Sequence, residues 1–131
     1  MQTINENSLV AFVFSHYHQS LKASQRAIRF LQHRGFSDPD LVDDLYLGYS
    51  DRTLGRQLPP DTTPTGAAVR GCLRRLGLLR ASGHEQLWGC IAFPLRDPEG
   101  NIIGAYAFKL ADYEKGHRLV PVSWVRNMVP P

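Results

Sequence analysis

Residues 91–104 have the sequence IAFPLRDPEGNIIG, and this stretch decides the fold. Side chains alternate along residues 86–96 with a period of two, which is typical of a β-strand. Residues 97–101 are turn formers, with a proline in second place and a glycine that tolerates positive φ. Residues 102–110 follow as a second predicted strand, so the segment is predicted to be a β-hairpin. Pro94 places the first strand at a sheet edge or at a bulge, because proline cannot donate to the ladder.

A helical period precedes the hairpin, with apolar side chains recurring at 3.6-residue spacing. The predicted helices cover residues 8–21 and 24–34, a short stretch that begins near Pro39, and a longer one from Thr65 to Gly77. The predicted N-terminal caps are Asn7 or Ser8, then Ser24, Ser37 and Thr65. A further strand is expected within residues 118–125. Helices first and antiparallel strands later predict an α+β fold, in which N-terminal helices pack on a small antiparallel sheet that contains the C-terminal hairpin.

Length and composition exclude several classes of protein. The 131 residues are 43% hydrophobic and 21% charged, which suits one domain with a packed core and excludes wholesale disorder. No apolar run approaches the length of a transmembrane helix, and acid and amide side chains stand where a secretory signal carries positive charge. Two cysteines cannot build a disulfide framework or a four-ligand zinc site. The predicted compartment is the cytoplasm.

Charge is segregated along the chain, although the net charge is only +3. Residues 38–51 contain five acids and no base, whereas residues 52–80 contain six arginines and a single acid, Asp61. Arginine presents a planar fork that binds phosphate in a bidentate way. The second segment therefore predicts a basic patch with nucleic acid as its partner. An ordinary solvated surface rich in arginine is the open alternative.

No combination of residues indicates catalysis or a metal site. His16 and His18 are two positions apart, so on a helix they point in nearly opposite directions, and both are expected at the surface or near a helix end. Asp38 and Asp40 are explained by the dipole at a helix N-terminus. Cys72 lies on an apolar stripe and is expected in the core, while Cys90 is a candidate for exposure. Because phosphate-binding loops and nucleophile elbows are also absent, we expect no catalytic residue, no metal and no cofactor.

Several short motifs occur in an order that resembles one family. These motifs are AIRFLQHRG at 27–35, Leu47-Gly48-Tyr49, the helix end Leu76-Gly77-Leu78, and the hairpin IAFPLRDPEGNIIG at 91–104. Together they resemble the N-terminal subdomain of the catalytic core of bacterial DnaG-type DNA primases, the segment that precedes the Toprim domain. The resemblance covers about residues 9–111. It implies a single domain over residues 1–131, with 112–131 as a C-terminal extension.

The chain departs from the family pattern near the hairpin. Trp88 and Cys90 stand where family members carry arginines, and the family's F-G-G-R becomes Ala105 to Phe108, with Lys109 one position later. An offset of one residue moves a side chain to the opposite face of a strand, so Lys109 replaces the missing arginine only if a bulge shifts it. Aromatic stacking by Trp88, Tyr106 or Trp124 could compensate in nucleic-acid binding, or these residues could simply pack in the sheet.

The resemblance leads to two functional hypotheses. The zinc ribbon and the acidic Toprim site of the family are missing, so this polypeptide is not expected to polymerise nucleotides unaided. The first hypothesis is a non-catalytic module that binds single-stranded DNA template in DNA replication or in mobile-element maintenance. The predicted nucleic-acid-binding residues are Arg70, Arg74, Arg75, Arg96 and Lys109. The alternative, motivated by Trp88 and Trp124, is a protein-interaction module that recruits a helicase, a recombinase or a Toprim partner.

Overall fold

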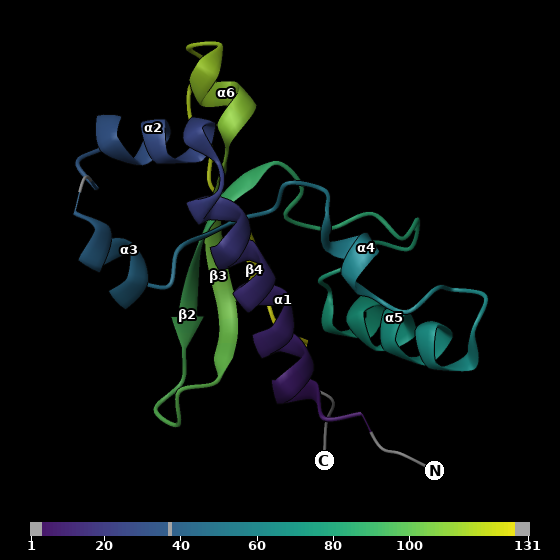
Figure 1. Cartoon of the computed structure of the whole chain (residues 1–131). Coiled ribbons are helices and arrows are strands. Elements are labelled where there is room, and N and C mark those ends of the chain that lie inside the picture. Colours follow the sequence, from purple (N-terminus) through teal and green to yellow (C-terminus); the bar gives the residue numbers. More distant parts are fainter. Residues whose placement is uncertain (1–3, 37, 128–131) are drawn as a thin grey trace.

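The computed structural model describes residues 4–36 and 38–127 and has an α+β fold (Figure 1). In chain order the elements are α1 (Glu6–Lys22), α2 (Gln25–His33), α3 (Pro39–Asp44), β1 (Gly48–Tyr49), α4 (Leu54–Gln57), α5 (Pro64–Leu76), β2 (Cys90–Arg96), β3 (Ile102–Lys109), α6 (Leu110–Glu114) and β4 (Val122–Val125). The predicted helices and the hairpin are confirmed, except that the first hairpin strand begins at Cys90 and not at Gln86, because residues 86–89 form a turn. The short helices α4 and α6 were not predicted.

Helix ends follow local side-chain chemistry, and three predicted caps are wrong. Asn5 caps α1 by accepting a hydrogen bond from the Ser8 amide at 3.0 Å, so the helix begins before the predicted Asn7 or Ser8. Ser24 caps α2 as predicted. Asp38, not Ser37, caps α3, and Ser37 itself lies outside the described residues.

The long helix α5 begins two residues earlier than a cap at Thr65 requires. The side-chain oxygen of Thr63 accepts a hydrogen bond from the Gly66 amide at 3.0 Å, and Pro64 occupies the first helical position. Proline suits this position because its missing N–H would have had no partner inside the helix. Gly77 ends the helix as predicted, with a φ of +85° in the left-handed region.

Four antiparallel strands form one sheet in the order β1-β2-β3-β4. The strand β1 pairs only with Ile91 and Ala92 of β2, so Pro94 has no neighbour on that side of the sheet. The predicted edge position of Pro94 is therefore confirmed. A shift in register follows between Leu95 and Arg96. Strand β4 falls inside the predicted segment 118–125.

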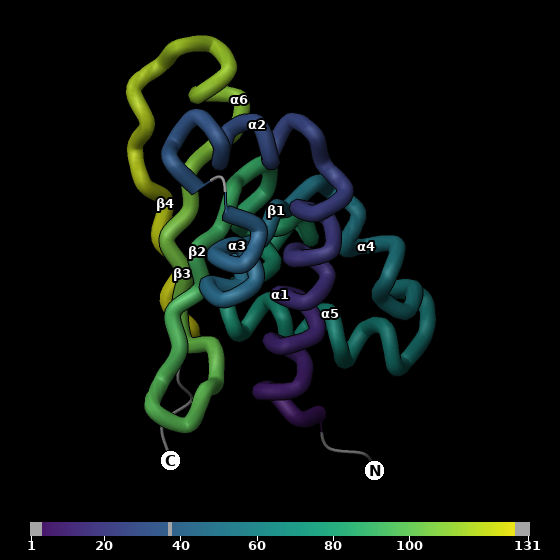
Figure 2. The backbone as a smooth tube through the Cα atoms, turned by 60° about the vertical axis from the view of Figure 1, so that its left-hand side comes forward, coloured from purple at the N-terminus to yellow at the C-terminus, as the bar shows by residue number. Residues whose placement is uncertain are grey.

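The two faces of the sheet differ in how helices cover them. Helices α1 and α5 lie on one side, and α2 and α6 lie across one end (Figures 1 and 2). We call the side under α1 and α5 the helix-covered face. Its buried strand residues join the core of those helices; they are Cys90, Ala92, Ile102, Ala105, Ala107 and Trp124. We call the other side the open face; Ile91, Phe93 and Phe108 lie on it beside the core formed with α2.

His18 is buried and not at the surface, although it lies in the last turns of α1, near the helix end that was the other position expected for it. Its Nδ1 lies 2.6 Å from the carbonyl oxygen of Leu47, and its Nε2 lies 3.0 Å from the carboxylate of Asp43. A hydrogen bond from Lys22, followed by that from His18, lowers the pKa of Asp43. The imidazole thus links α1 to the segment that leads into β1.

None of the helices in residues 4–36 and 38–127 combines the length and the apolar composition that a membrane crossing requires. In the same residues, no three His, Cys, Asp or Glu side chains gather closely enough to hold a metal ion.

Candidate nucleic-acid interface

The five predicted DNA-binding side chains occupy three parts of the molecule. Arg70 and Arg74 lie one turn apart on α5; Arg70 lines a pocket that the 79–89 loop also lines, and Arg74 approaches this loop at Gly83. Arg75 lies elsewhere on the helix, near Cys72 and the 126–127 segment. Arg96 and Lys109 lie at opposite ends of the hairpin, separated along the ladder by about 20 Å. The structure therefore brings Arg70 and Arg74 together and leaves the other three apart.

Arg70 already has partners inside the protein. Its Nε donates to the carbonyl oxygen of Pro59 at 3.0 Å, and its Nη2 donates to that of Gly55 at 3.1 Å. These bonds tie α4 and the following loop to α5. Among residues 4–36 and 38–127, the one partner of the Arg74 side chain is Asp61, in a distant ion pair in which Nη2 lies 3.9 Å from the carboxylate. Of the two, Arg74 keeps more of its hydrogen-bonding capacity for a ligand.

The hairpin cations face different surroundings. Arg96 donates to the carbonyl oxygen of Gly100 at 2.8 Å, and its guanidinium lies 5.2 Å from the centre of the Tyr46 ring. Lys109 pairs with Cys90 in the ladder, whereas Phe108 pairs with Ile91. The register shift lies at the other end of the hairpin, so no bulge moves Lys109 onto the open face. Phe108 therefore occupies the face on which the resemblance expects an arginine.

A cleft of about 440 Å³ lies between α4, α5 and the 79–89 loop. The side chains that give it charge and aromatic surface are Arg52, Arg70, His84, Glu85 and Trp88. The guanidinium carbon of Arg52 lies 3.8 Å from the centre of the Trp88 ring, a close cation–π contact. The His84 ring lies 6.5 Å from Trp88, whose residue surface is 38% exposed. An accessible indole thus lies among three basic side chains.

The acid of this cleft is turned inward. Glu85 is buried and accepts a hydrogen bond from the Ser50 hydroxyl at 2.8 Å. Burial, followed by the nearby Glu85 charge, raises the pKa of Tyr17 well above its usual value. Asp51, at the adjacent turn, accepts hydrogen bonds from the amide and the hydroxyl of Thr53. The solvent-facing charge of the cleft is therefore positive, which favours a phosphate-bearing ligand.

Two side chains that were considered for exposure are buried, and for Trp124 the alternative of packing in the sheet is confirmed. Trp124 is 3% exposed, and its indole N–H donates to the carbonyl oxygen of Leu76 at 2.9 Å, so it is a core residue. Cys90 is buried as well, beneath the turn that carries Trp88. Cys72 is buried as predicted. Of the three aromatic residues considered for stacking, Trp88 and Tyr106 remain accessible.

We expect both cysteines to resist alkylation in the folded protein. Burial raises the pKa of Cys90 to about 11 and also raises the pKa of Cys72. At pH 8, about one Cys90 thiol in a thousand is ionised, and the thiolate is the reactive form. Mass spectrometry after brief exposure to iodoacetamide should find no adduct without denaturant and two adducts in 8 M urea. Rapid labelling of Cys90 in the folded protein would contradict its burial.

Arg52 and His84 were not predicted as site residues. Arg52 was counted in the basic segment, but its role in the cleft could not be predicted from the sequence. Its contact with Trp88 joins residues 36 positions apart and depends on tertiary packing. Arg52 also has a φ of +73°, which is uncommon for a residue with a side chain. Trp88 did give a signal, since it stands where the resemblance expects a basic residue.

Comparison with solved structures identifies the class of fold. A DnaG catalytic core superposes with a TM-score of 0.71 at 20% identity, covering 95% of this chain and 38% of the other. A DnaG primase catalytic domain bound to single-stranded DNA gives 0.68 at 20%, covering 95% and 39%. A DNA primase domain from Pseudomonas aeruginosa gives 0.71 at 23%, covering 92% and 38%. No family model matches the sequence, and no curated protein matches it.

The chain therefore has a fold found in the catalytic core of DnaG-type primases. The resemblance inferred from short motifs is confirmed at the level of the fold. The chain spans about two fifths of the length of the primase structures it matches.

Proposed function

We propose that this chain is a primase-related module that binds single-stranded DNA and has no catalytic centre of its own. The observation that carries the proposal is the cleft at Trp88, where an exposed indole is flanked by Arg52, Arg70 and His84 while Glu85 is turned inward. Single-strand binding commonly combines a positively charged groove with aromatic side chains on which bases stack. A primase domain of the same fold has been solved with single-stranded DNA bound.

The roles of the cleft residues follow from their contacts. Trp88 offers its accessible ring surface to a base, a stacking worth about 1–3 kcal/mol. Arg52, held against the ring, and His84, beside it, would contact the adjoining phosphates. Arg74 would extend the contact along α5, whereas Arg70 chiefly holds the wall of the cleft.

Lys109 and Arg96, two of the other predicted residues, could contact the DNA only outside the cleft. Lys109 lies at the base of the hairpin, opposite Cys90 and close to the Trp88 turn. Arg96 lies about 20 Å further along the hairpin. A single-stranded DNA that contacted both Lys109 and Arg96 would run along the hairpin after leaving the cleft. We place this activity in the cytoplasm, in DNA replication or mobile-element maintenance, with any nucleotidyl transfer supplied by a metal-binding Toprim segment or partner.

Fluorescence anisotropy with a labelled thymidine dodecamer across a salt series tests the proposal. Trp88→Ala should weaken binding by about 5- to 150-fold, the equivalent of one lost stacking contact. Arg52→Ala and Arg74→Ala should each reduce the slope of log affinity against log salt by about 0.7. Arg118→Ala, which removes an exposed arginine outside the cleft, is the matched control and should leave the slope unchanged. Absence of binding at low salt, or equal effects of all three arginine variants, would refute the proposed site.

The alternative function is recruitment of a helicase, a recombinase or a Toprim partner. It was motivated by Trp88 and Trp124, and Trp124 no longer supports it because that side chain is buried. A different observation favours protein binding: apolar side chains are exposed on the open face of the sheet, away from the Trp88 cleft.

A further inference from the structure

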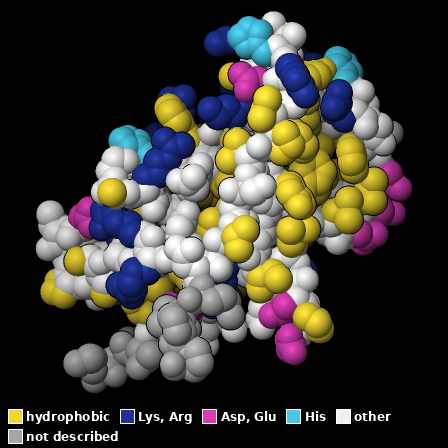
Figure 3. Space-filling model, turned by 180° about the vertical axis from the view of Figure 1, so that it is seen from behind, with side chains coloured by type: hydrophobic (Ala, Val, Ile, Leu, Met, Phe, Trp, Pro, Cys, Tyr) yellow, Lys and Arg dark blue, Asp and Glu magenta, His cyan; other side chains and the backbone are white. Residues whose placement is uncertain are grey.

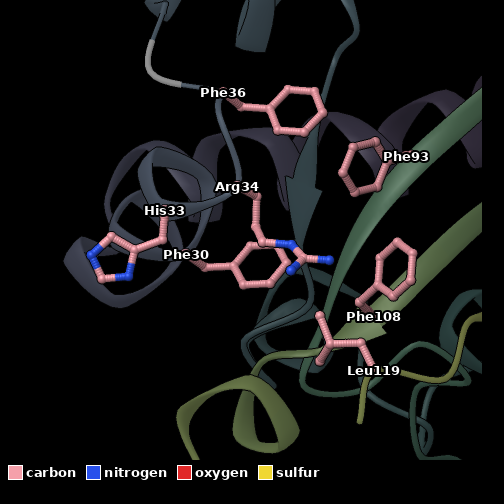
Figure 4. Close-up of a pocket in the computed structure, with 7 residues that line it drawn as sticks. All are labelled: Phe30, His33, Arg34, Phe36, Phe93, Phe108 and Leu119. Atoms are coloured by element: carbon pink, nitrogen blue, oxygen red, sulfur yellow. The ribbon is translucent and has the colours of Figure 1, made fainter. Parts of the chain in front are cut away.

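A second cavity, of about 500 Å³, lies where α2 meets the open face of the sheet (Figure 4). We call it the aromatic pocket. Its apolar walls are Phe30, Phe36, Phe93, Phe108 and Leu119, contributed by α2, the segment after it, both hairpin strands and the stretch before β4. Phe93 makes edge-to-face contacts with Phe36 and with Phe108, at centroid distances of 5.7 and 6.0 Å. The pocket is therefore lined by rings from segments far apart in the sequence.

One cation enters this apolar surface. The guanidinium of Arg34 points from the end of α2 into the space between Phe30 and Phe108, while His33 turns toward the outside (Figure 4). Within residues 4–36 and 38–127, the Arg34 side chain has neither a carboxylate nor a hydrogen-bond acceptor as a partner. Arg26, on the same helix, shows the contrast, since its Nε donates to Glu114 at 2.8 Å. The aromatic pocket thus offers an unused bidentate donor beside apolar walls.

Exposed apolar side chains continue from the pocket along the open face. Leu95, Tyr106 and Val125 are 43%, 52% and 74% exposed, and the strand register puts them on the same side as Phe93 and Phe108. Figure 3 shows the resulting apolar surface, with lysine, arginine and histidine side chains along its upper border and acidic side chains at its right-hand edge and below it. A continuous apolar surface of this kind marks an interaction site more often than chance exposure does.

We propose that the aromatic pocket and the open face bind an extended acidic peptide, with a bulky apolar side chain in the pocket and an adjacent carboxylate on Arg34. Charge complementarity carries the choice of partner, because Arg34 at the pocket and the cations along the upper border form the end of the patch where an anionic group would be attracted. The aliphatic surface around Leu95 and Val125 favours a peptide over a nucleic acid, since apolar side chains can cover it and phosphates cannot. This site lies apart from the Trp88 cleft and does not depend on DNA binding.

Two-dimensional ¹H–¹⁵N NMR titration of the full chain tests the proposal. The probe is the acetylated, amidated hexapeptide Gly-Asp-Phe-Asp-Leu-Gly, and its matched control carries asparagine in place of both aspartates. The acidic peptide should shift the amide signals of Arg34, Phe108 and Leu119 and bind on the order of tenfold more tightly than the control. Arg34→Gln should remove that preference. Arg29→Gln, an exposed arginine of the same helix that does not line the pocket, should preserve it.

Four outcomes would overturn the proposal. They are equal affinity for the two peptides, no shift at the pocket with either peptide, a shift of the same amides by hexathymidylate, and a shift of these amides with protein concentration alone. The third would assign the pocket to nucleic acid and the fourth to a second copy of the chain. Because the peptide titration contains no DNA, its failure and a failure of the anisotropy experiment are distinguishable.

Discussion

Trp124→Ala is expected to lower the free energy of unfolding by about 3–5 kcal/mol, the usual cost of removing a buried tryptophan. The ring is 3% exposed and packs on Phe14 at a centroid distance of 5.5 Å. Its N–H also satisfies the carbonyl of Leu76 in the last turn of α5, at 2.9 Å. The substitution would therefore leave both a cavity and an unpaired buried carbonyl. Urea denaturation followed by circular dichroism measures the loss.

Two further variants separate these contributions. Trp124→Phe keeps most of the volume but removes the donor, so we expect a loss of about 1–2 kcal/mol. Val125→Ala changes the next residue of β4, which is 74% exposed, and should alter stability by less than about 0.5 kcal/mol. If Trp124→Ala proved as mild as Val125→Ala, the packing of β4 against α5 would be incorrect.

Gly66→Ala should destabilise the protein by about 3 kcal/mol, although alanine is the better helix former. A Cβ atom at this position would lie 1.8 Å from the carbonyl oxygen of Pro60 and 2.7 Å from that of Pro59. Both obstacles are backbone atoms, so relief requires the 59–60 segment to move away from α5. Thermal unfolding monitored by circular dichroism should show a lower Tm.

Gly71→Ala in the same helix is the matched control. There a Cβ atom would meet only the end of the Arg75 side chain, at 3.7 Å. Replacing a glycine inside a helix at an unobstructed position should stabilise the protein by about 0.5–1 kcal/mol. Opposite signs for these two glycine-to-alanine changes are the expected result, and a stabilising Gly66→Ala would disprove the close approach of the proline loop.

Local chemistry made the hairpin predictable from the sequence. Alternation along the strand, turn residues at 97–101 and the edge preference of Pro94 act over a few neighbours, and the pairing of β2 with β1 and β3 confirms them from Cys90 onward. The alternation predicted for residues 86–89 is wrong, because those residues form a turn. The caps were less predictable because several suitable residues stand close together at each helix start. Thr63 and Thr65 flank Pro64, and either threonine could cap the helix. Because proline favours the first helical position, the residue before it, Thr63, becomes the cap.

The candidate sites depended more on tertiary packing. A charge surplus over residues 52–80 identified arginines without showing their directions, and Arg70 proved to be bonded to backbone carbonyls. The opposite faces of Phe108 and Lys109 did follow from the period of a strand. The clustering of Arg52, His84 and Trp88, like that of the four phenylalanines, requires segments distant in sequence to meet, and no local pattern encodes that.

The double hydrogen bond from Arg70 to Pro59 and Gly55 has a consequence for how genetic data on this protein would be interpreted. A mutational scan scored by phenotype would rank Arg70 among the most sensitive arginines, and its charge would invite the conclusion that it contacts a ligand directly. The sensitivity would arise instead from a loosened cleft wall. Replacement by lysine separates the two explanations, since it retains the positive charge but cannot span both carbonyls with a rigid fork.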